Sequence, residues 1–299
     1  MQDKSGDEHI EQASVDEEYQ DYINKNRKYK SLIIKFISLL LLVFVMDLFY
    51  LASIWPDFDS FKKGRVAKSR VIKNYELTHS DIKVMWIPLK RRIPKRIKEV
   101  FVIAEDSRFY THSGIDYIAI RDAIRYNLTS SKRMLGASTI SQQTVKNMFL
   151  SLSRNPLRKW HELLMTMAME KSLTKDRILD IYLNIAEMGK SLYGIEAASR
   201  YYFAKASYKL TSIEAIELAA TLPNPKKDNP RTRSAAFLKR KRKILRNWRF
   251  LHPKKPAIVG EKSILPRLEQ LNSEHRKNQQ QSFETFPKRQ YGPKEKATN

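Results

Sequence analysis

The most prominent hydrophobic feature of this chain is one long apolar run near its N-terminus. The run Leu32–Ile54, LIIKFISLLLLVFVMDLFYLASI, places apolar side chains on every face of a helix, which is unlike the single stripe of a helix in a soluble core. As a helix it measures roughly 34 Å, enough to cross a hydrocarbon layer of about 30 Å. Asp47 would cost about 3 kcal/mol at mid-membrane, but the aliphatic and aromatic side chains outweigh it. The run therefore predicts a single membrane-spanning helix over residues 32–54.

The flanks of this run predict its orientation. Residues 1–31 are acidic as far as Asp21 and then basic from Lys25 to Lys30, with few apolar side chains, which is typical of a disordered arm. The basic cluster before the span favours a cytoplasmic N-terminus and an external location for the rest of the chain. Lys62, Lys63 and Arg65 on the other side oppose this assignment. A cleaved signal peptide is disfavoured because the preceding segment is long and acidic.

Beyond residue 65 the apolar positions recur every three to four residues, which predicts an all-α domain over residues 65–252. Ser138 is the expected N-cap of a helix that begins at Thr139, and Thr211 with Glu214 forms a capping box. We find no alternating strand pattern, and we expect the polar, basic tail 253–299 to be disordered. The expected helices cover Ile97–Ile103, Ile115–Ile124, Ile140–Leu150, Leu157–Leu173, Ile178–Ala186, Ile213–Leu222 and Ser234–Leu251.

The amino-acid composition limits the partners and the kinds of functional site that this chain can have. The 299 residues include 56 Lys and Arg against 32 Asp and Glu, a net charge of +24, so an anionic partner is expected. The absence of Cys excludes disulfides, thiolate metal sites and a Cys nucleophile. Eight Gly residues form no phosphate-binding loop, and the six His are too dispersed for a metal cluster.

Four segments of the helical region carry candidate chemistry. Glu105 and Asp106 end a helix and enter a loop that contains His112, a position suited to a catalytic acid but equally to a solvated helix end. Residues 136–147 form a polar helix entry, whose N–H groups can face an anion. Arg158 lies four residues before Glu162 on one helix face, which can also be a surface ion pair. Residues 175–184 are most simply explained as core.

In this order the segments resemble the motifs of the family-51 glycosyltransferases, the peptidoglycan transglycosylases. The resemblance covers about residues 84–248; Ala137 replaces a Gly common in the family, and residues 226–233 are unusually basic. The matching motifs are E-x-x-x-F-x-x-H-x-G at Glu105–Gly114, G-x-S-T-I-x-Q-Q-x-x-K-N at Gly136–Asn147, R-K-x-x-E at Arg158–Glu162, K-x-x-I-L-x-x-Y-L-N at Lys175–Asn184 and R-[RK]-x-x-[VI]-L at Arg240–Leu245.

The resemblance implies a lysozyme-like helical glycosyltransferase domain that polymerises lipid II into β-1,4-linked glycan strands. It implies that Glu105 is the general base and that Glu162 assists departure of the pyrophosphate or holds a divalent cation such as Mg²⁺. The segment Lys132, Arg133, Met134 and Leu135 resembles the part of the family that contacts the bilayer. The substrate-binding residues implied are Ser138, Gln142, Gln143, Lys146, Arg158, Lys159, Lys175 and Asn184.

The same resemblance implies an enzyme of the bacterial inner membrane, with its catalytic domain on the periplasmic side. Its expected partners are lipid II, the growing glycan strand, the bilayer and other cell-wall synthesis proteins, and not nucleic acid. Two alternatives stay open. One is a lysozyme-like glycan hydrolase, which shares a catalytic Glu but has no need of a cationic cradle. The other is a membrane-tethered basic binding protein, for which we find no recognised motif.

Overall fold

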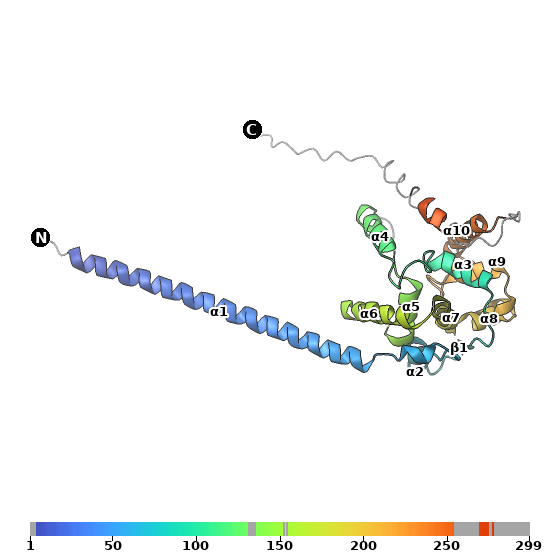
Figure 1. The fold of residues 1–299 in the computed structure, drawn as a ribbon, viewed down its shortest axis with the longest axis horizontal. Helices are drawn as coiled ribbons and strands as arrows, with labels where there is room; N and C mark the ends of the chain where they lie inside the picture. Colours follow the sequence, from blue (N-terminus) through green and yellow to red (C-terminus); the bar gives the residue numbers. More distant parts are fainter. Residues whose placement is uncertain are drawn as a thin grey trace, which may run out of the picture. The chain divides into compact units, whose positions relative to one another are not determined.

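The computed structural model describes residues 4–130, 136–151, 153, 155–253, 269–274 and 277. The chain divides into two compact units, Met1–Pro56 and Asp57–Asn299. Figure 1 labels the helices of both units and the strand β1. The predicted membrane-contact residues Lys132, Arg133, Met134 and Leu135 lie outside the described residues.

The first unit contains one long helix, α1, Lys4–Ser53. Within its apolar part an 18-residue window has a mean hydropathy of 2.6 and none of that window is buried in protein, as expected of a segment that faces lipid. The helix also extends back to Lys4, where the sequence predicts a disordered arm. The arm contains no Pro and many Glu, Gln and Lys residues, and extending an existing helix avoids the cost of nucleation.

The second unit is a helical domain, and it confirms the predicted all-α class. The helix α3 packs against α9 and α10, and α5 packs against α6 and α7 (Figure 1). These two sets of contacts place the candidate site residues. The helices are α2 Arg70–Thr78, α3 Lys95–Glu105, α4 Tyr117–Thr129, α5 Ile140–Phe149, α6 Pro156–Ser172, α7 Lys175–Ile185, α8 Ile195–Phe203, α9 Ser212–Thr221 and α10 Ala235–Leu251, with short 3-10 turns η1 Phe58–Phe61 and η2 Ser207–Lys209.

Side-chain caps fix where the helices begin. Thr139, and not Ser138, is the N-cap of α5, and its hydroxyl accepts from the Gln142 N–H while the Gln142 side chain accepts from the Thr139 N–H. The predicted cap was wrong by one residue because Gln142 stands three positions after Thr139, the spacing a capping box requires. The capping box of α9, Thr211 with Glu214, is confirmed.

A small sheet was not predicted. Its strands are β1 Met85–Trp86, β2 Glu187–Gly189 and β3 Leu192–Tyr193 in the order β1-β3-β2, with β1 parallel and β2 antiparallel to β3. Strands of two or three residues are too short to show alternation. Gly194 follows β3 with φ of +79°, and a Cβ there would lie 2.4 Å from the Asn184 carbonyl oxygen, so this position requires glycine.

Part of the predicted disordered tail is helical in the structure. Residues 269–274 form a helical turn, and Leu271 packs against the buried pair Ile103 and Leu251. The Ser107 hydroxyl donates a 2.7 Å hydrogen bond to Asn272 Oδ1. A single leucine in a polar stretch was too weak a signal to predict this contact.

Candidate active site

Glu105 is the last residue of α3, and its side chain is 12% exposed. One carboxylate oxygen accepts a 2.5 Å hydrogen bond from the Arg240 guanidinium of α10, and the other accepts a 3.2 Å bond from Gln143 Nε2 of α5. Arg240 also donates to the carbonyl oxygen of Ala104. Because α5 and α10 lie far apart in the sequence, the fold itself assembles this carboxylate site.

The environment of Glu105 moves its pKa above the ordinary value. Burial is the largest cause because it disfavours the charged carboxylate, and the neighbouring charge of Asp106 acts in the same direction. The positive charge of Arg240 and the Gln143 hydrogen bond oppose the shift without cancelling it. A carboxylate with a raised pKa accepts a proton more readily, which is the property that a general base needs.

Gln143 is held in turn by Tyr182 of α7. The Tyr182 hydroxyl donates a 3.2 Å hydrogen bond to Gln143 Oε1, and this orients the amide so that its NH₂ group faces Glu105. Burial raises the pKa of Tyr182 well above its usual value, so the phenol remains a neutral donor. The sequence predicted that Tyr182 belongs to the core, and the side chain is indeed buried. Its hydroxyl group in addition contacts Gln143 of the site.

The second charged group of the site is centred on Glu162 of α6, whose side chain is 3% exposed. Arg158 donates a 2.6 Å hydrogen bond to one Glu162 oxygen, and Lys159 donates to the other. Arg158 also donates to the Ser153 carbonyl oxygen at 2.6 Å. The ion pair that the spacing of Arg158 and Glu162 suggested is therefore present, but its carboxylate is buried and not at the surface.

Lys146 of α5 connects the two groups electrostatically. Burial lowers its pKa, and it lies in the field of Glu162, Arg158, Lys159 and Glu105, of which the two carboxylates oppose the decrease and the two cations add to it. Its ammonium is therefore partly desolvated and lies close enough to interact with both glutamates. Such a cation binds an incoming anion more strongly than a solvated lysine does.

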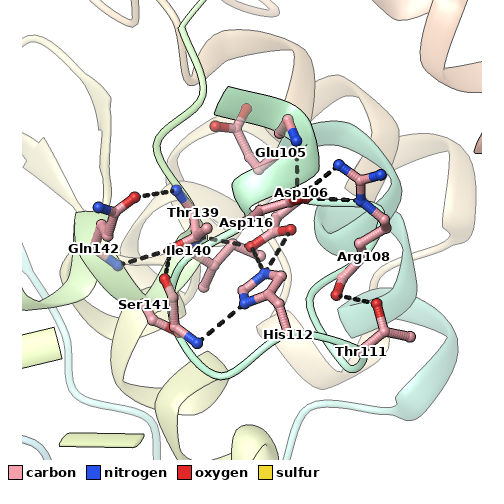
Figure 2. A network of polar contacts seen from close by, with 12 residues as sticks. Glu105, Asp106, Arg108, Thr111, His112, Asp116, Thr139, Ile140, Ser141 and Gln142 are labelled. Atoms are coloured by element: carbon pink, nitrogen blue, oxygen red, sulfur yellow. Dashed lines mark hydrogen bonds and ion pairs between the residues drawn. The ribbon is translucent and has the colours of Figure 1, made fainter. Parts of the chain in front are cut away.

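A network of hydrogen bonds supports the loop after Glu105 (Figure 2). The Asp106 carboxylate contacts His112 Nε2 at 3.0 Å and accepts a 3.0 Å bond from the Ile140 N–H, which joins the end of α3 to the start of α5. Arg108 donates two bonds, of 2.8 and 2.6 Å, to Asp116, the N-cap of α4. His112 thus has a structural position in this loop.

Gly114 closes the same loop. It has φ of +90°, and a Cβ there would lie 2.8 Å from the Thr166 methyl group. Its carbonyl oxygen accepts a 2.6 Å bond from the Thr139 hydroxyl. The glycine of the first motif is therefore required by geometry, because its φ is positive and a side chain would clash with Thr166 of α6.

The structure distributes the predicted substrate-binding residues among different places. Ser138 lines a cavity of about 270 Å³ together with Glu105 and Gly136, where its hydroxyl can reach a ligand. Gln142 is 2% exposed and its side chain belongs to the α5 capping box. The candidate site therefore contains Ser138, Gln143, Lys146, Arg158 and Lys159, and Gln142 positions the helix that carries two of them.

Lys175 and Asn184 have scaffold roles in this structure. Lys175 donates a 2.7 Å bond to Glu170, and its ammonium lies 4.6 Å from the centre of the Phe109 ring. The Asn184 side chain accepts from the Leu89 N–H at 2.9 Å and donates to the Asp180 carbonyl oxygen at 2.8 Å. The sequence could not separate these residues from the site, because it does not show which side chains the fold brings together.

A divalent cation near Glu162 stays a prediction. Both Glu162 oxygens already accept from Arg158 and Lys159, so a metal would have to displace one of these cations. Within the described residues, one group of three potential ligands lies close together, Asp106, His112 and Asp116. Its carboxylates are engaged by Arg108, His112 and backbone N–H groups. The residues present therefore fit a set of internal ion pairs better than a metal site.

Arg240 was the main residue that sequence reasoning missed. It begins the fifth motif, and the site residues chosen from the sequence did not include it. Its motif membership was the available signal, but only the packing of α10 on α3 reveals that its partner is Glu105.

The comparison with known families agrees with this geometry. A model of the Transglycosylase family matches residues 68–249, more than half of the chain. The chain belongs to the transglycosylase family. The match begins just after the second unit starts and ends within α10, so it contains every transglycosylase site residue described above.

Several relatives of this transglycosylase carry the name biosynthetic peptidoglycan transglycosylase. The one from Haemophilus influenzae is 50% identical over 144 residues, which is 48% of this chain and 58% of that protein. The one from Aeromonas hydrophila is 47% identical over 146 residues, 49% of this chain and 61% of that protein. The one from Chromobacterium violaceum is 38% identical over 190 residues, 64% of this chain and 81% of that protein. The first of these matches thus spans little more than half of the relative's length.

Proposed function

We propose that this transglycosylase polymerises lipid II into β-1,4-linked glycan strands and releases polyprenyl pyrophosphate. One observation carries the proposal: Lys146 interacts electrostatically both with Glu105 and with the group of Glu162, Arg158 and Lys159. A base and a cationic cradle are the two requirements for attack by a sugar hydroxyl on a donor with a pyrophosphate leaving group.

The base step belongs to Glu105. The 4-hydroxyl of the acceptor sugar attacks the anomeric carbon of the donor, and its proton passes to the Glu105 carboxylate. The new O–C bond forms as the bond from the anomeric carbon to the phosphate oxygen breaks, with inversion at that carbon. Gln143 and Arg240 hold the carboxylate in place, and its raised pKa supports proton uptake.

The leaving-group step belongs to the cations. Pyrophosphate leaves with the electron pair of the broken bond, so it needs its negative charge stabilised more than it needs a proton. Lys146, Arg158 and Lys159 supply that charge, and Glu162 fixes the latter two through ion pairs. If a divalent cation takes part, it would supply further charge neutralisation for the phosphates.

A membrane location is required by the proposed substrate, because the lipid part of that substrate lies in the bilayer. The apolar part of α1 is compatible with a membrane anchor, and a lipid-linked substrate enters from the bilayer. We propose a single pass through the bacterial inner membrane, with the catalytic domain on the periplasmic side. Lys132, Arg133, Met134 and Leu135 remain proposed bilayer contacts, and other cell-wall synthesis proteins remain proposed partners.

The test is to give the purified full-length protein two substrates, lipid II and finished glycan strands. The proposal expects polymer from lipid II and no cleavage of strands. A glycan hydrolase has no phosphate to bind and would cleave strands without consuming lipid II, and that result would overturn the proposal.

A further inference from the structure

A second cavity, of about 1050 Å³, lies in the helical unit away from the residues assigned to catalysis. Neither Glu105, Glu162 nor Lys146 lines it. Its walls come from the connector after α1, from the segment before α3, from α3 itself and from α7. The connector and the segment before α3 contribute six cationic side chains: Lys62, Lys63, Arg65, Lys90, Arg91 and Arg92.

Basic side chains outnumber acidic ones in the walls, with nine Lys and Arg residues against Glu99, Asp176 and Asp180. Lys98 lies 2.7 Å from Asp180 and 3.7 Å from Asp176, and Glu99 lies 3.4 Å from His252. The three carboxylates are too few to balance the nine Lys and Arg side chains of the cavity. The excess positive charge of the cavity remains available for a ligand.

Two of the six cations have a partner among the ion pairs and ring contacts of the described residues. Lys62 pairs with Asp59, and Arg91 lies over the Tyr208 ring. Within the part of the chain that the structure describes, the ion pairs include none to Lys63, Arg65, Lys90 or Arg92. Like charges held together in this way repel one another unless an anion joins them.

The fold holds both basic segments in place. The Arg177 guanidinium donates a 2.6 Å bond to the Phe61 carbonyl oxygen and a 2.9 Å bond to that of Gly64. The Phe61 ring packs edge-on against Phe149 at 5.4 Å. On the other segment, the Leu89 N–H donates to Asn184. The cations thus project from anchored backbone, which lowers the entropic cost of binding.

The connector also limits the distance of the cavity from the bilayer. Lys62 follows Ser53, the last residue of α1, by nine positions, and even a fully extended chain of that length spans only about 30 Å. With the apolar part of α1 in a membrane, the basic connector stays near the head groups at the end of the span. Cations near an anionic leaflet attract its phosphates.

We propose that this cavity binds the phosphate head group of an anionic phospholipid, and so orients the domain on the bilayer. A phosphodiester carries the negative charge and the acceptor oxygens that lysine and arginine recognise. A free phosphate ion shares this chemistry, and the experiment separates the two sources.

The test uses the full-length protein in detergent, with phosphatidylglycerol or phosphatidylcholine added, and native mass spectrometry to count the retained lipid. The cavity variant carries Lys63→Gln, Arg65→Gln, Lys90→Gln and Arg92→Gln. The control variant loses the same charge from exposed lysines outside the cavity, through Lys73→Gln, Lys83→Gln, Lys171→Gln and Lys190→Gln. Circular dichroism and thermal melting verify that both variants fold.

The expected result is preferential retention of phosphatidylglycerol by the wild type and the control, and about a tenfold or greater loss in the cavity variant. Equal retention by the wild type and the cavity variant would overturn the proposal, as would an equal loss in both variants. A third arm adds inorganic phosphate alone. Tight binding of phosphate that depends on the four cavity residues, without selective lipid retention, would assign the cavity to a free ion and overturn the lipid proposal.

Discussion

At the scale of single residues, the site depends on how burial and charge oppose each other at Glu105. Burial raises the pKa of its carboxyl, while Arg240 and Gln143 lower it. A base must be deprotonated to act, so activity should fall as the pH decreases through this raised pKa. The balance between these contributions sets the acid limit of turnover.

The Arg240→Gln variant tests that balance. Loss of the guanidinium charge removes the largest lowering contribution, so the pKa of Glu105 should rise further and the acid limb of the kcat/KM profile should move to higher pH. Arg240→Lys is the matched control, because it keeps the charge and should keep the limb near its wild-type position. If the acid limb of Arg240→Gln stays in place, Arg240 does not influence the pKa of the general base, and the proposed role of Arg240 is wrong.

Two lysine variants distinguish a role in catalysis, proposed for Lys146, from a structural role, proposed for Lys175. Lys146→Met removes a cation between the two glutamates, so turnover should fall about 10²- to 10³-fold while the fold persists. Lys175→Met removes the partner of buried Glu170, so it should cost about 1–3 kcal/mol of stability. Turnover assays and thermal melts of both proteins measure the contrast. Equal losses of turnover in the two variants would show that Lys175 belongs to the substrate-binding site, as the sequence predicted.

At the scale of elements, helix α5 brings the two halves of the site together. Its N-terminal turn is tied to the Asp106 loop through the Ile140 N–H and to Gly114 through the Thr139 hydroxyl. Two neighbouring glutamines on it have different tasks. Gln142 completes the cap, and Gln143 contacts Glu105.

The two glutamine variants should therefore behave differently. Gln142→Ala should lower stability by about 0.5–2 kcal/mol through loss of the capping box, with most of the turnover retained. Gln143→Ala removes a hydrogen bond to a charged group, worth about 1.5–3 kcal/mol, so turnover should fall about 10- to 100-fold. Denaturant unfolding and lipid II turnover measure the two effects. A rate loss in Gln142→Ala as large as that in Gln143→Ala would contradict the division of roles.

The elements also show what the sequence could predict. The helical period located most helices of the domain, because each buries one face against the others. It missed the short strands, which alternate over too few residues, and it misplaced the α5 cap by one position. In the site, motif membership found Glu105 and Glu162. It could not separate Lys146 from Lys175 or identify Arg240 as a partner of Glu105, because these relations depend on the packing of α5, α6 and α10.

At the scale of the whole molecule, the chain combines an apolar helix with a strongly basic catalytic domain. The net charge of +24 is consistent with the proposed lipid pyrophosphate substrate and with a location at an anionic membrane surface. The helix α1 is uninterrupted from Lys4 to Ser53, so its basic residues Lys25 to Lys30 flank the apolar part directly. That cluster favours a cytoplasmic N-terminus.

Protease added to intact spheroplasts tests this topology. The region after Trp55 should be digested, while the acidic segment before Lys25 should be spared until the membrane is permeabilised. An epitope at each end reports the two fates separately. Digestion of the N-terminal segment alone would reverse the orientation, and the proposed periplasmic location would then be wrong.

The most direct measurement for the account as a whole is the turnover of lipid II by Glu105→Gln. The amide keeps the size of the side chain but cannot accept a proton from the acceptor hydroxyl, so polymerisation should fall by about 10²- to 10⁴-fold. Thermal melting should show an intact fold, and binding of a lipid pyrophosphate should persist because Lys146, Arg158 and Lys159 are unchanged. A variant that folds and keeps more than about a tenth of the wild-type turnover would contradict the assignment of Glu105 as the general base.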